Sequence, residues 1–104
     1  MDAQEYQDIL DDLLEKVRCY DELDPPTLHS QIVFGGIANV LDAMKIGDPS
    51  SIVPNGDGGI CFEWHSKDRR YAISLEVMDD GKLDLVIFED CKIVFRFDGE
   101  ERTQ

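Results

Sequence analysis

The sequence has no hydrophobic run long enough to cross a membrane, and it has few basic residues. Apolar runs such as residues 85–88 are strand-sized, whereas a membrane-spanning helix needs roughly 20 apolar residues. Ten Lys and Arg stand against 23 Asp and Glu, a formal net charge of -13, which repels nucleic acids and anionic lipids. The N-terminus also lacks the basic start and apolar core of a secretion signal. We therefore expect a cytoplasmic protein that neither spans a membrane nor binds nucleic acid directly.

Cysteine and histidine are also scarce. Cys19, Cys61 and Cys91 form an odd set at irregular spacing, unlike the disulfide framework of a small secreted domain, so we read them as reduced thiols. Cys61 and His65 are the closest Cys–His pair, but along a strand they would lie roughly 13 Å apart, too far to share a proton or one metal ion. His29, the other histidine, reads as a surface residue near a helix start.

Known ligand-binding motifs are missing as well. The glycine-rich residues 55–59 lack the Gly-Lys-Ser/Thr ending of a phosphate loop, and a strand rather than a helix is expected after them, unlike a dinucleotide fingerprint. They also lack the ligand spacing and terminal glutamate of a calcium loop. Adjacent acids such as Asp11 and Asp12 read as solvated surface rather than a catalytic pair. We predict no catalytic residue, no cofactor and no metal site.

What the chain does have is the composition of one small domain. Its 104 residues are 42% hydrophobic, which is enough to fold around one modest core. The predicted organisation is a helical hairpin over residues 1–46, a linker loop over 47–58, an antiparallel sheet over 59–98 and a polar tail over 99–104.

Two amphipathic helices are predicted in the first half. Over about residues 2–22 apolar residues recur at spacings of three and four, and the prolines after Asp24 end the helix. A second helix over 27–46 ends at Gly47, and Gly35 and Gly36 in its middle indicate a close approach of the first helix or the sheet, with a binding role as the alternative. The apolar stripe of the first helix is Tyr6, Ile9, Leu10, Leu13, Leu14, Val17 and Tyr20. That of the second helix is Val33, Phe34, Ile37, Val40, Leu41 and Met44.

Alternating apolar residues predict four strands between residues 59 and 98, joined by short turns into an antiparallel meander. The fold class is therefore α+β, with two N-terminal helices packed on one face of a four-stranded sheet (ααββββ). Keeping the apolar residues on one face sets the register. The predicted pairs are Trp64 with Tyr71, Phe62 with Ile73, Ile60 with Leu75, Val77 with Leu83, Ile87 with Ile93 and Leu85 with Phe95, leaving loops at 66–69, 79–81 and 89–91.

The same register predicts the content of the opposite sheet face. Asp84 should lie opposite Arg96, and Val86 opposite Val94. Charged residues there surround an apolar cluster, which is typical of a protein-binding surface or a homodimer seam. The alternative is that a helix or the folded-back tail covers the cluster. The cluster consists of Ala72, Val86, Phe88 and Val94.

Charge is concentrated at the N-terminal end. Residues 1–24 hold nine acids and two bases, a net charge of -7. The first helix carries Asp8, Asp11, Asp12 and Glu15 on its polar face, and we take them as candidates for binding a basic partner, the alternative being a solvated helix surface. His65 and Arg70 should be neighbours at the polar end of the first hairpin, and we take them as candidates for reading a ligand.

The residues of the first hairpin resemble a pattern in small uncharacterised bacterial proteins. The pattern is Gly58, Gly59, Ile60, Cys61, Phe62, Glu63, Trp64 and His65, followed by residues 71–77 and by Asp80 and Gly81. It is similar to the glycine-led, Glu-Trp-containing hairpin of those proteins, which often accompany mobile or defence-related gene sets. The resemblance implies no catalytic residue.

For function we expect a small acidic protein that binds a protein partner with a basic surface. It would act as an inhibitor or adaptor, such as an antitoxin, an immunity protein or a phage-type antagonist. In a more specific version the acids of the first helix imitate nucleic-acid phosphates and block a basic groove. The alternatives are a small-ligand-binding or enzymatic domain that uses the hairpin loops, and a homo-oligomeric structural protein.

Overall fold

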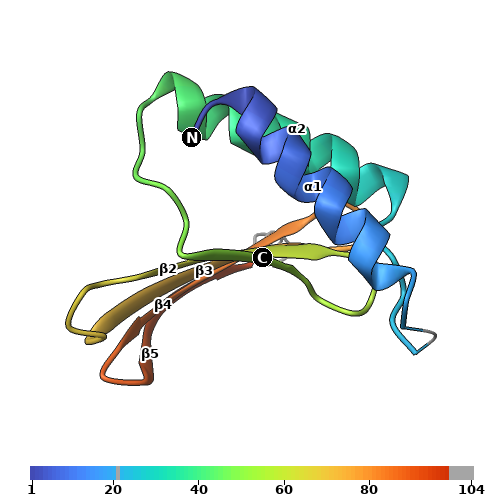
Figure 1. Ribbon diagram of the computed structural model, residues 1–104. Coiled ribbons are helices and arrows are strands. Elements are labelled where there is room, and N and C mark those ends of the chain that lie inside the picture. The colour runs from blue at the N-terminus through green and yellow to red at the C-terminus, as the bar shows by residue number, and fades with distance from the viewer. Residues whose placement is uncertain (21, 99–104) are drawn as a thin grey trace.

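The computed structural model describes residues 1–20 and 22–98, so the predicted tail over 99–104 lies outside the described residues (Figure 1). Two helices lie on one face of a single antiparallel sheet whose strand order is β1-β2-β3-β4-β5. The α+β class is confirmed, but the sheet has five strands rather than four. Neither helix in the described part is long and apolar enough to cross a membrane. The elements are α1 (Ala3–Val17), α2 (Leu28–Ala43), β1 (Ser51–Pro54), β2 (Ile60–His65), β3 (Tyr71–Val77), β4 (Leu83–Glu89) and β5 (Lys92–Asp98).

The additional strand, β1, lies inside the segment predicted to be a linker loop. It pairs antiparallel with β2, with Ile52 opposite Phe62 and Pro54 opposite Ile60. Only two adjacent apolar residues, Ile52 and Val53, mark the strand in the sequence, too few to display an alternating pattern. β1 is an edge strand, where a proline such as Pro54 is tolerated.

Helix α1 begins at a capping box. The Asp2 carboxylate accepts a hydrogen bond from the Glu5 N–H at 2.9 Å, and the Glu5 carboxylate accepts one from the Asp2 N–H at 2.9 Å. Each carboxylate therefore satisfies a backbone donor that has no partner within the helix. The buried residues of α1 belong to the predicted stripe and are Tyr6, Leu10, Leu13 and Val17.

Helix α1 ends at Val17, before the predicted end near Glu22. The Tyr20 N–H bonds to the Val17 carbonyl at 3.0 Å, an i to i+3 turn, and Tyr20 is 56% exposed instead of buried. The Asp24 N–H then donates to the Gly56 carbonyl at 3.0 Å, which ties the connection between the helices to the loop before β2.

Helix α2 buries a different part of its circumference from the predicted stripe. Phe34 and Leu41 are in the core as expected, but Val40 and Met44 are 52% and 68% exposed. Ala38, which was not in the predicted stripe, is buried instead. The reason is that α2 carries apolar residues on most sides, so periodicity alone does not select one face.

The two glycines in the middle of α2 do not mark a contact within the chain. A Cβ placed on Gly35 or Gly36 would meet no atom of the described residues within 4 Å beyond the adjacent helix backbone. The predicted close approach of α1 or the sheet is therefore wrong.

Helix α2 ends through Lys45 rather than Gly47. Lys45 has a φ of 56°, in the left-handed region. Its N–H donates to the Asp42 carbonyl at 3.2 Å, and the Ile46 N–H donates to the Leu41 carbonyl at 3.1 Å. These two bonds form a Schellman motif, in which glycine is the usual left-handed residue.

We therefore predict that Lys45→Gly stabilises the protein. The substitution removes the clash of a Cβ with the following carbonyl and should raise the free energy of unfolding by about 1 kcal/mol. Urea denaturation followed by circular dichroism measures the change. Lys16→Gly, within α1, is the matched control and should lower stability by a similar amount. Equal destabilisation by both variants would contradict the assignment of this helix end.

The β2–β3 hairpin is shifted by two residues from the predicted register. Trp64 lies opposite Ile73 instead of Tyr71, and Phe62 lies opposite Leu75 instead of Ile73. A shift of two residues leaves every apolar side chain on its predicted face, so the alternating pattern cannot distinguish the two registers. The loop accordingly covers residues 66–70.

The β3–β4 hairpin has the predicted pairing. Val77 lies opposite Leu83, and the Met78 N–H bonds to the Lys82 carbonyl at 2.8 Å, which closes the three-residue loop 79–81. Gly81 has a φ of 87°, the left-handed conformation that such loops require.

The β4–β5 hairpin differs from the prediction in both its turn and its pairing. Asp90 and Cys91, with φ values of 53° and 67°, make a two-residue turn. A register irregularity follows, so that Phe88 faces Ile93 while Ile87 faces Phe95. One extra residue on β5 breaks the strict alternation on which the predicted register was based.

Aromatic side chains join the helices to the sheet. The rings of Phe34 and Phe62 stack with centroids 5.1 Å apart, and Tyr6 meets Phe34 edge-on at 6.3 Å. Trp64 stacks on Phe62 at 6.0 Å and donates its indole N–H to the Gly47 carbonyl at 2.9 Å. Trp64 thus packs along its own strand, not on Tyr71 as predicted.

The helices cover only part of the sheet. The Cα atoms of α1 come within 8 Å of those of β1, and the Cα atoms of α2 come that close to β2 and β3, while in the described residues no helix Cα lies within 8 Å of a Cα of β4 or β5. The full hydrophobic core predicted for this face is therefore incomplete. Residues that share the helix-facing side but lie beyond the helices are 38–50% exposed, and we call them the open sheet half. They are Tyr71, Ile73, Phe95 and Phe97.

Candidate functional site

The four predicted acids of α1 are all exposed and follow one side of the helix. Asp12 forms an ion pair with Lys16 at 3.0 Å, and Glu15 lies 3.9 Å from the Arg18 guanidinium. Such exposed pairs hold the carboxylates only weakly.

Asp8 and Asp11 have a different environment. Their carboxylates accept hydrogen bonds from the side-chain amides of Gln4 at 2.9 Å and Gln7 at 3.0 Å, and the described residues offer them no ion-pair partner. Their negative charge is therefore available to an approaching molecule.

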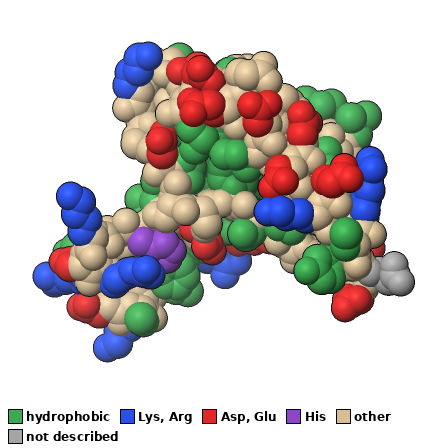
Figure 2. All heavy atoms as spheres, in the orientation of Figure 1, with side chains coloured by type: hydrophobic (Ala, Val, Ile, Leu, Met, Phe, Trp, Pro, Cys, Tyr) green, Lys and Arg blue, Asp and Glu red, His purple; other side chains and the backbone are tan. Residues whose placement is uncertain are grey.

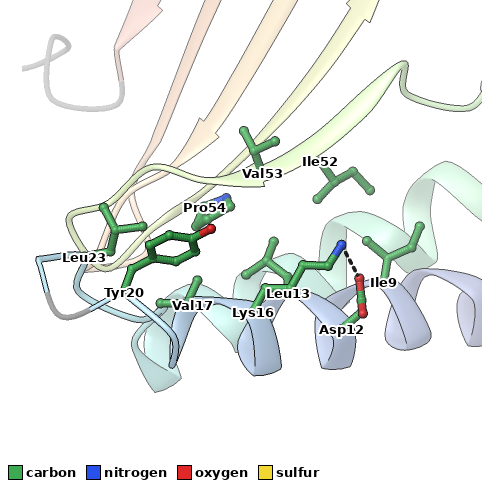
Figure 3. A pocket seen from close by; sticks show the side chains of 10 residues that line it. All are labelled: Ile9, Asp12, Leu13, Lys16, Val17, Tyr20, Leu23, Ile52, Val53 and Pro54. Carbon is green, nitrogen blue, oxygen red and sulfur yellow. Dashed lines mark ion pairs between the residues drawn. The ribbon is translucent and has the colours of Figure 1, made fainter.

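An apolar groove runs between α1 and the edge strand β1 (Figure 3). It has a volume of about 290 Å³, and Asp12 and Lys16 lie at its rim. Figure 2 shows hydrophobic side chains in the hollow between the helix layer and the sheet, below acidic side chains of the helix layer. The apolar residues that line the groove are Ile9, Leu13, Val17, Tyr20, Leu23, Ile52, Val53 and Pro54.

Sequence reasoning missed this groove for two reasons. Residues 51–54 fall in the predicted linker loop, so no strand is expected beside α1. Tyr20 was assigned to the core, whereas it is 56% exposed at the end of the groove. Val53 is 41% exposed, and Ile52 and Val53, the sequence signal of the strand, are too few to show its alternation.

On the opposite sheet face the predicted apolar cluster is rearranged. Ala72 lies opposite Phe88, which brings these two together. Val86 lies opposite Arg96 rather than Val94, and Val94, 56% exposed, sits at the register irregularity. Both helices lie on the other face of the sheet (Figure 1), so neither covers the cluster. The alternative cover, the tail, lies outside the described residues.

The predicted pairing of Asp84 with Arg96 survives in a different geometry. Asp84 lies opposite Asp98 in the strand register. The Arg96 guanidinium nevertheless reaches the Asp84 carboxylate diagonally, at 2.9 Å.

His65 and Arg70 do come together, with Phe88, around an open depression of about 510 Å³. Arg70, in the β2–β3 loop, is engaged by the β4–β5 hairpin: its guanidinium lies 2.7 Å from the Glu89 carboxylate and 3.7 Å from that of Asp90. Ala72, Arg69 and Cys91 complete the lining.

Asn55 does not line this depression. Its side-chain oxygen accepts hydrogen bonds from the N–H groups of Asp57 and Gly59, both at 2.8 Å, and its amide donates to Glu76 at 2.6 Å. These bonds shape the turn before β2.

Charge is divided between the two parts of the molecule. The hairpin turns 66–70 and 90–91 lie at one end of the sheet, and bases lie in and beside both turns. Figure 2 shows a group of basic side chains and a histidine at that end, and several acidic side chains over the helix layer. The bases at this end are Lys67, Arg69, Arg70 and Lys92.

The three cysteines carry no disulfide, and Cys61 is partly buried while Cys19 and Cys91 are exposed. Burial raises the pKa of the Cys61 thiol, an effect only partly offset by the hydroxyl of Ser74, which lies 3.3 Å from the sulfur. A raised pKa favours the unreactive thiol at neutral pH. The described residues also contain no group of three His, Cys, Asp or Glu side chains placed to hold a metal ion.

We predict that Cys61 is alkylated by iodoacetamide several times more slowly than Cys19 and Cys91, because its thiolate is disfavoured and its sulfur half-buried. Peptide mass spectrometry of a time course at neutral pH measures the three rates. In urea the three rates should converge. Fastest modification of Cys61 in the folded protein would instead indicate an activated thiol.

No protein-family model, curated protein or solved structure matches this chain. The resemblance of the first hairpin to small uncharacterised bacterial proteins thus stays a prediction.

Proposed function

We propose that this protein binds a basic partner protein through the groove between α1 and β1, as an inhibitor or adaptor. The observation that carries the proposal is an apolar groove with Asp12 in its lining, on a helix whose exposed side also carries Asp8 and Asp11, which have no ion-pair partner among the described residues. A partner segment with apolar side chains flanked by Lys or Arg complements both features.

The two features have separate roles. Burial of the partner's apolar side chains in the groove stabilises the complex, because apolar burial is the main favourable term in association. The carboxylates raise the association rate and select basic partners. With a net charge of -13, the protein attracts a basic surface over about one Debye length, roughly 8 Å at physiological ionic strength.

Such a surface suits an inhibitor of another protein, for example an antitoxin, an immunity protein or a phage-type antagonist. If the basic surface of the partner is itself a nucleic-acid groove, the α1 carboxylates act as phosphate mimics. In that case DNA or RNA competes with this protein for the partner.

The depression near His65 and Phe88 supports a second candidate, the binding of a small anionic ligand. We prefer the α1–β1 groove because Arg70, the central base of the depression, is already engaged by Glu89 and Asp90. A ligand would have to displace these contacts.

A direct experiment uses a synthetic amphipathic helical peptide with leucines on one side and lysines on the other. Titrated into isotopically labelled protein, it should shift the NMR signals of groove residues such as Ile9, Val17 and Ile52. Its association should slow as salt is added, since exposed charges are screened. Shifts confined to the depression or to strands β3 to β5, or an association rate that does not change with salt, would overturn the proposal.

Charge removal at α1 provides the matched test. The double variant Asp8→Asn and Asp11→Asn keeps an oxygen for each glutamine amide but removes two charges. It should weaken peptide binding between about twofold and 30-fold, because each exposed charge pair contributes roughly 0.2–1 kcal/mol.

The control removes two charges elsewhere, with Asp80→Asn and Asp90→Asn. Both positions are in turns, and asparagine tolerates the left-handed backbone of residue 90. Binding should be nearly unchanged. Equal weakening by the two double variants would show that only net charge matters and that α1 is no specific surface.

A further inference from the structure

Asn55 and Gly56 form the only Asn-Gly sequence in the chain. In such a pair the backbone nitrogen of the glycine can attack the side-chain amide of the asparagine, because glycine has no Cβ to obstruct the approach. The other asparagine, Asn39, precedes the β-branched Val40, which obstructs the same attack. Asn55 is therefore the asparagine of this chain that is more open to spontaneous deamidation.

Deamidation at this pair needs only water as a co-reactant. A bond forms between the Gly56 nitrogen and Cγ of Asn55, and the bond from Cγ to Nδ2 breaks. Nδ2 takes the proton that the Gly56 nitrogen loses and leaves as ammonia, so that a cyclic succinimide remains. Water then opens the ring at either carbonyl and leaves an aspartate or an isoaspartate.

Three hydrogen bonds hold the Asn55 amide in the folded chain. Its Oδ1 accepts the N–H groups of Asp57 and Gly59, both at 2.8 Å, and its Nδ2 donates to the Glu76 carboxylate at 2.6 Å. Asn55 is half-buried, and a Cβ on the buried Gly59 would lie only 2.5 Å from Nδ2. Ring closure moves Cγ to the Gly56 nitrogen and expels Nδ2, so it breaks these bonds.

The backbone around the attacking nitrogen is held as well. The Gly56 carbonyl accepts the Asp24 N–H at 3.0 Å. The Gly58 carbonyl accepts the Thr27 N–H at 2.9 Å and the buried Ser30 hydroxyl at 3.0 Å. These bonds tie residues 55–59, which we call the Asn55 turn, to the connection between the helices and to the start of α2. The Gly56 peptide therefore cannot rotate freely while the turn is closed.

We propose that Asn55 is a deamidation site gated by the fold. The closed Asn55 turn protects the amide, and local opening of the turn releases it for attack by the Gly56 nitrogen. Segments of a native protein open locally at a free energy below that of global unfolding. The deamidation rate of the folded protein is then the rate of the open chain multiplied by the fraction of molecules with an open turn.

Deamidation prevents the turn from closing again as before. The new carboxylate has no N–H to donate to Glu76 and is repelled by its charge. Isoaspartate also adds a methylene to the main chain directly before Gly56. Pro54 and Leu23 line the α1–β1 groove, and a Cβ on Gly56 would lie 3.4 Å from the Leu23 side chain, so the change reaches a wall of the groove. The inference does not depend on the proposed function, because deamidation is measured without any partner.

Incubation of the full chain in a mildly alkaline buffer, with and without urea, tests the proposal. Peptide mass spectrometry locates the deamidated residue by its mass gain. Asn55 should deamidate at least about tenfold faster in urea than in the folded protein, because even one hydrogen bond to a charged group shifts an equilibrium by about that factor. Asn39 should stay largely intact in both. Equal or faster deamidation of Asn55 in the folded protein would overturn the proposal and would show that the two N–H groups on Oδ1 act as an oxyanion hole.

Glu76→Ala removes the acceptor of Nδ2 and should raise the deamidation rate of the folded protein about tenfold. Hydrogen exchange of the Asp57 and Gly59 N–H groups, followed by NMR, should accelerate by the same factor, because the same opening exposes them. An unchanged deamidation rate would contradict the gating. If circular dichroism shows that this variant is unfolded, Glu76→Gln keeps an acceptor oxygen and should give a smaller increase in both rates.

Glu63→Ala is the matched control. Glu63 is on β2, on the same sheet face as Glu76, and it also accepts one side-chain hydrogen bond, but from Ser51 at 2.9 Å. Its removal should leave the deamidation rate of Asn55 within about twofold of the wild type, because effects at separate sites are nearly independent. An equal increase in Glu63→Ala and Glu76→Ala would reject a gate formed by the Asn55 turn and would assign the protection to the stability of the whole sheet.

Discussion

The stacking of Phe34 on Phe62 fixes where the helix layer sits on the sheet. Both rings are almost completely buried, their centroids are 5.1 Å apart, and Tyr6 closes the cluster edge-on. Because Phe62 is on β2, the second of five strands, this anchor lies off the centre of the sheet. The helices therefore cover β1 to β3, and the open sheet half and the α1–β1 groove follow from that displacement.

The sequence predicted those features that repeat with a fixed period. The stripe from Tyr6 to Val17 identified α1, and alternation identified β2 to β5, because burial of one face imposes these periods. It could not predict β1, which has two apolar residues, or the β2–β3 register, where a shift of two residues changes no face. It also could not choose the buried side of α2, whose exposed residues Ile32 and Met44 are as apolar as its core residues.

The candidate surfaces were predictable to different degrees. The exposed acids of α1 follow directly from the polar side of an amphipathic helix. The groove beside them depends on β1, so it could not be predicted once that strand was missed. The meeting of His65, Arg70 and Phe88 required only the antiparallel order of the strands, which places both hairpin turns at one end. The uncovered side of α2 is a tertiary property, because it depends on which residues the sheet leaves exposed.

Trp64 has a consequence for spectroscopy. It is the only tryptophan in the chain, it stacks on Phe62 within the aromatic anchor, and its indole N–H is held by the Gly47 carbonyl. The indole therefore contacts both the Phe62 ring, against which the helices pack, and the segment that leads from α2 to β1. Intrinsic fluorescence excited at this indole reports the docking of the helix layer on the sheet from one known position, without any attached dye.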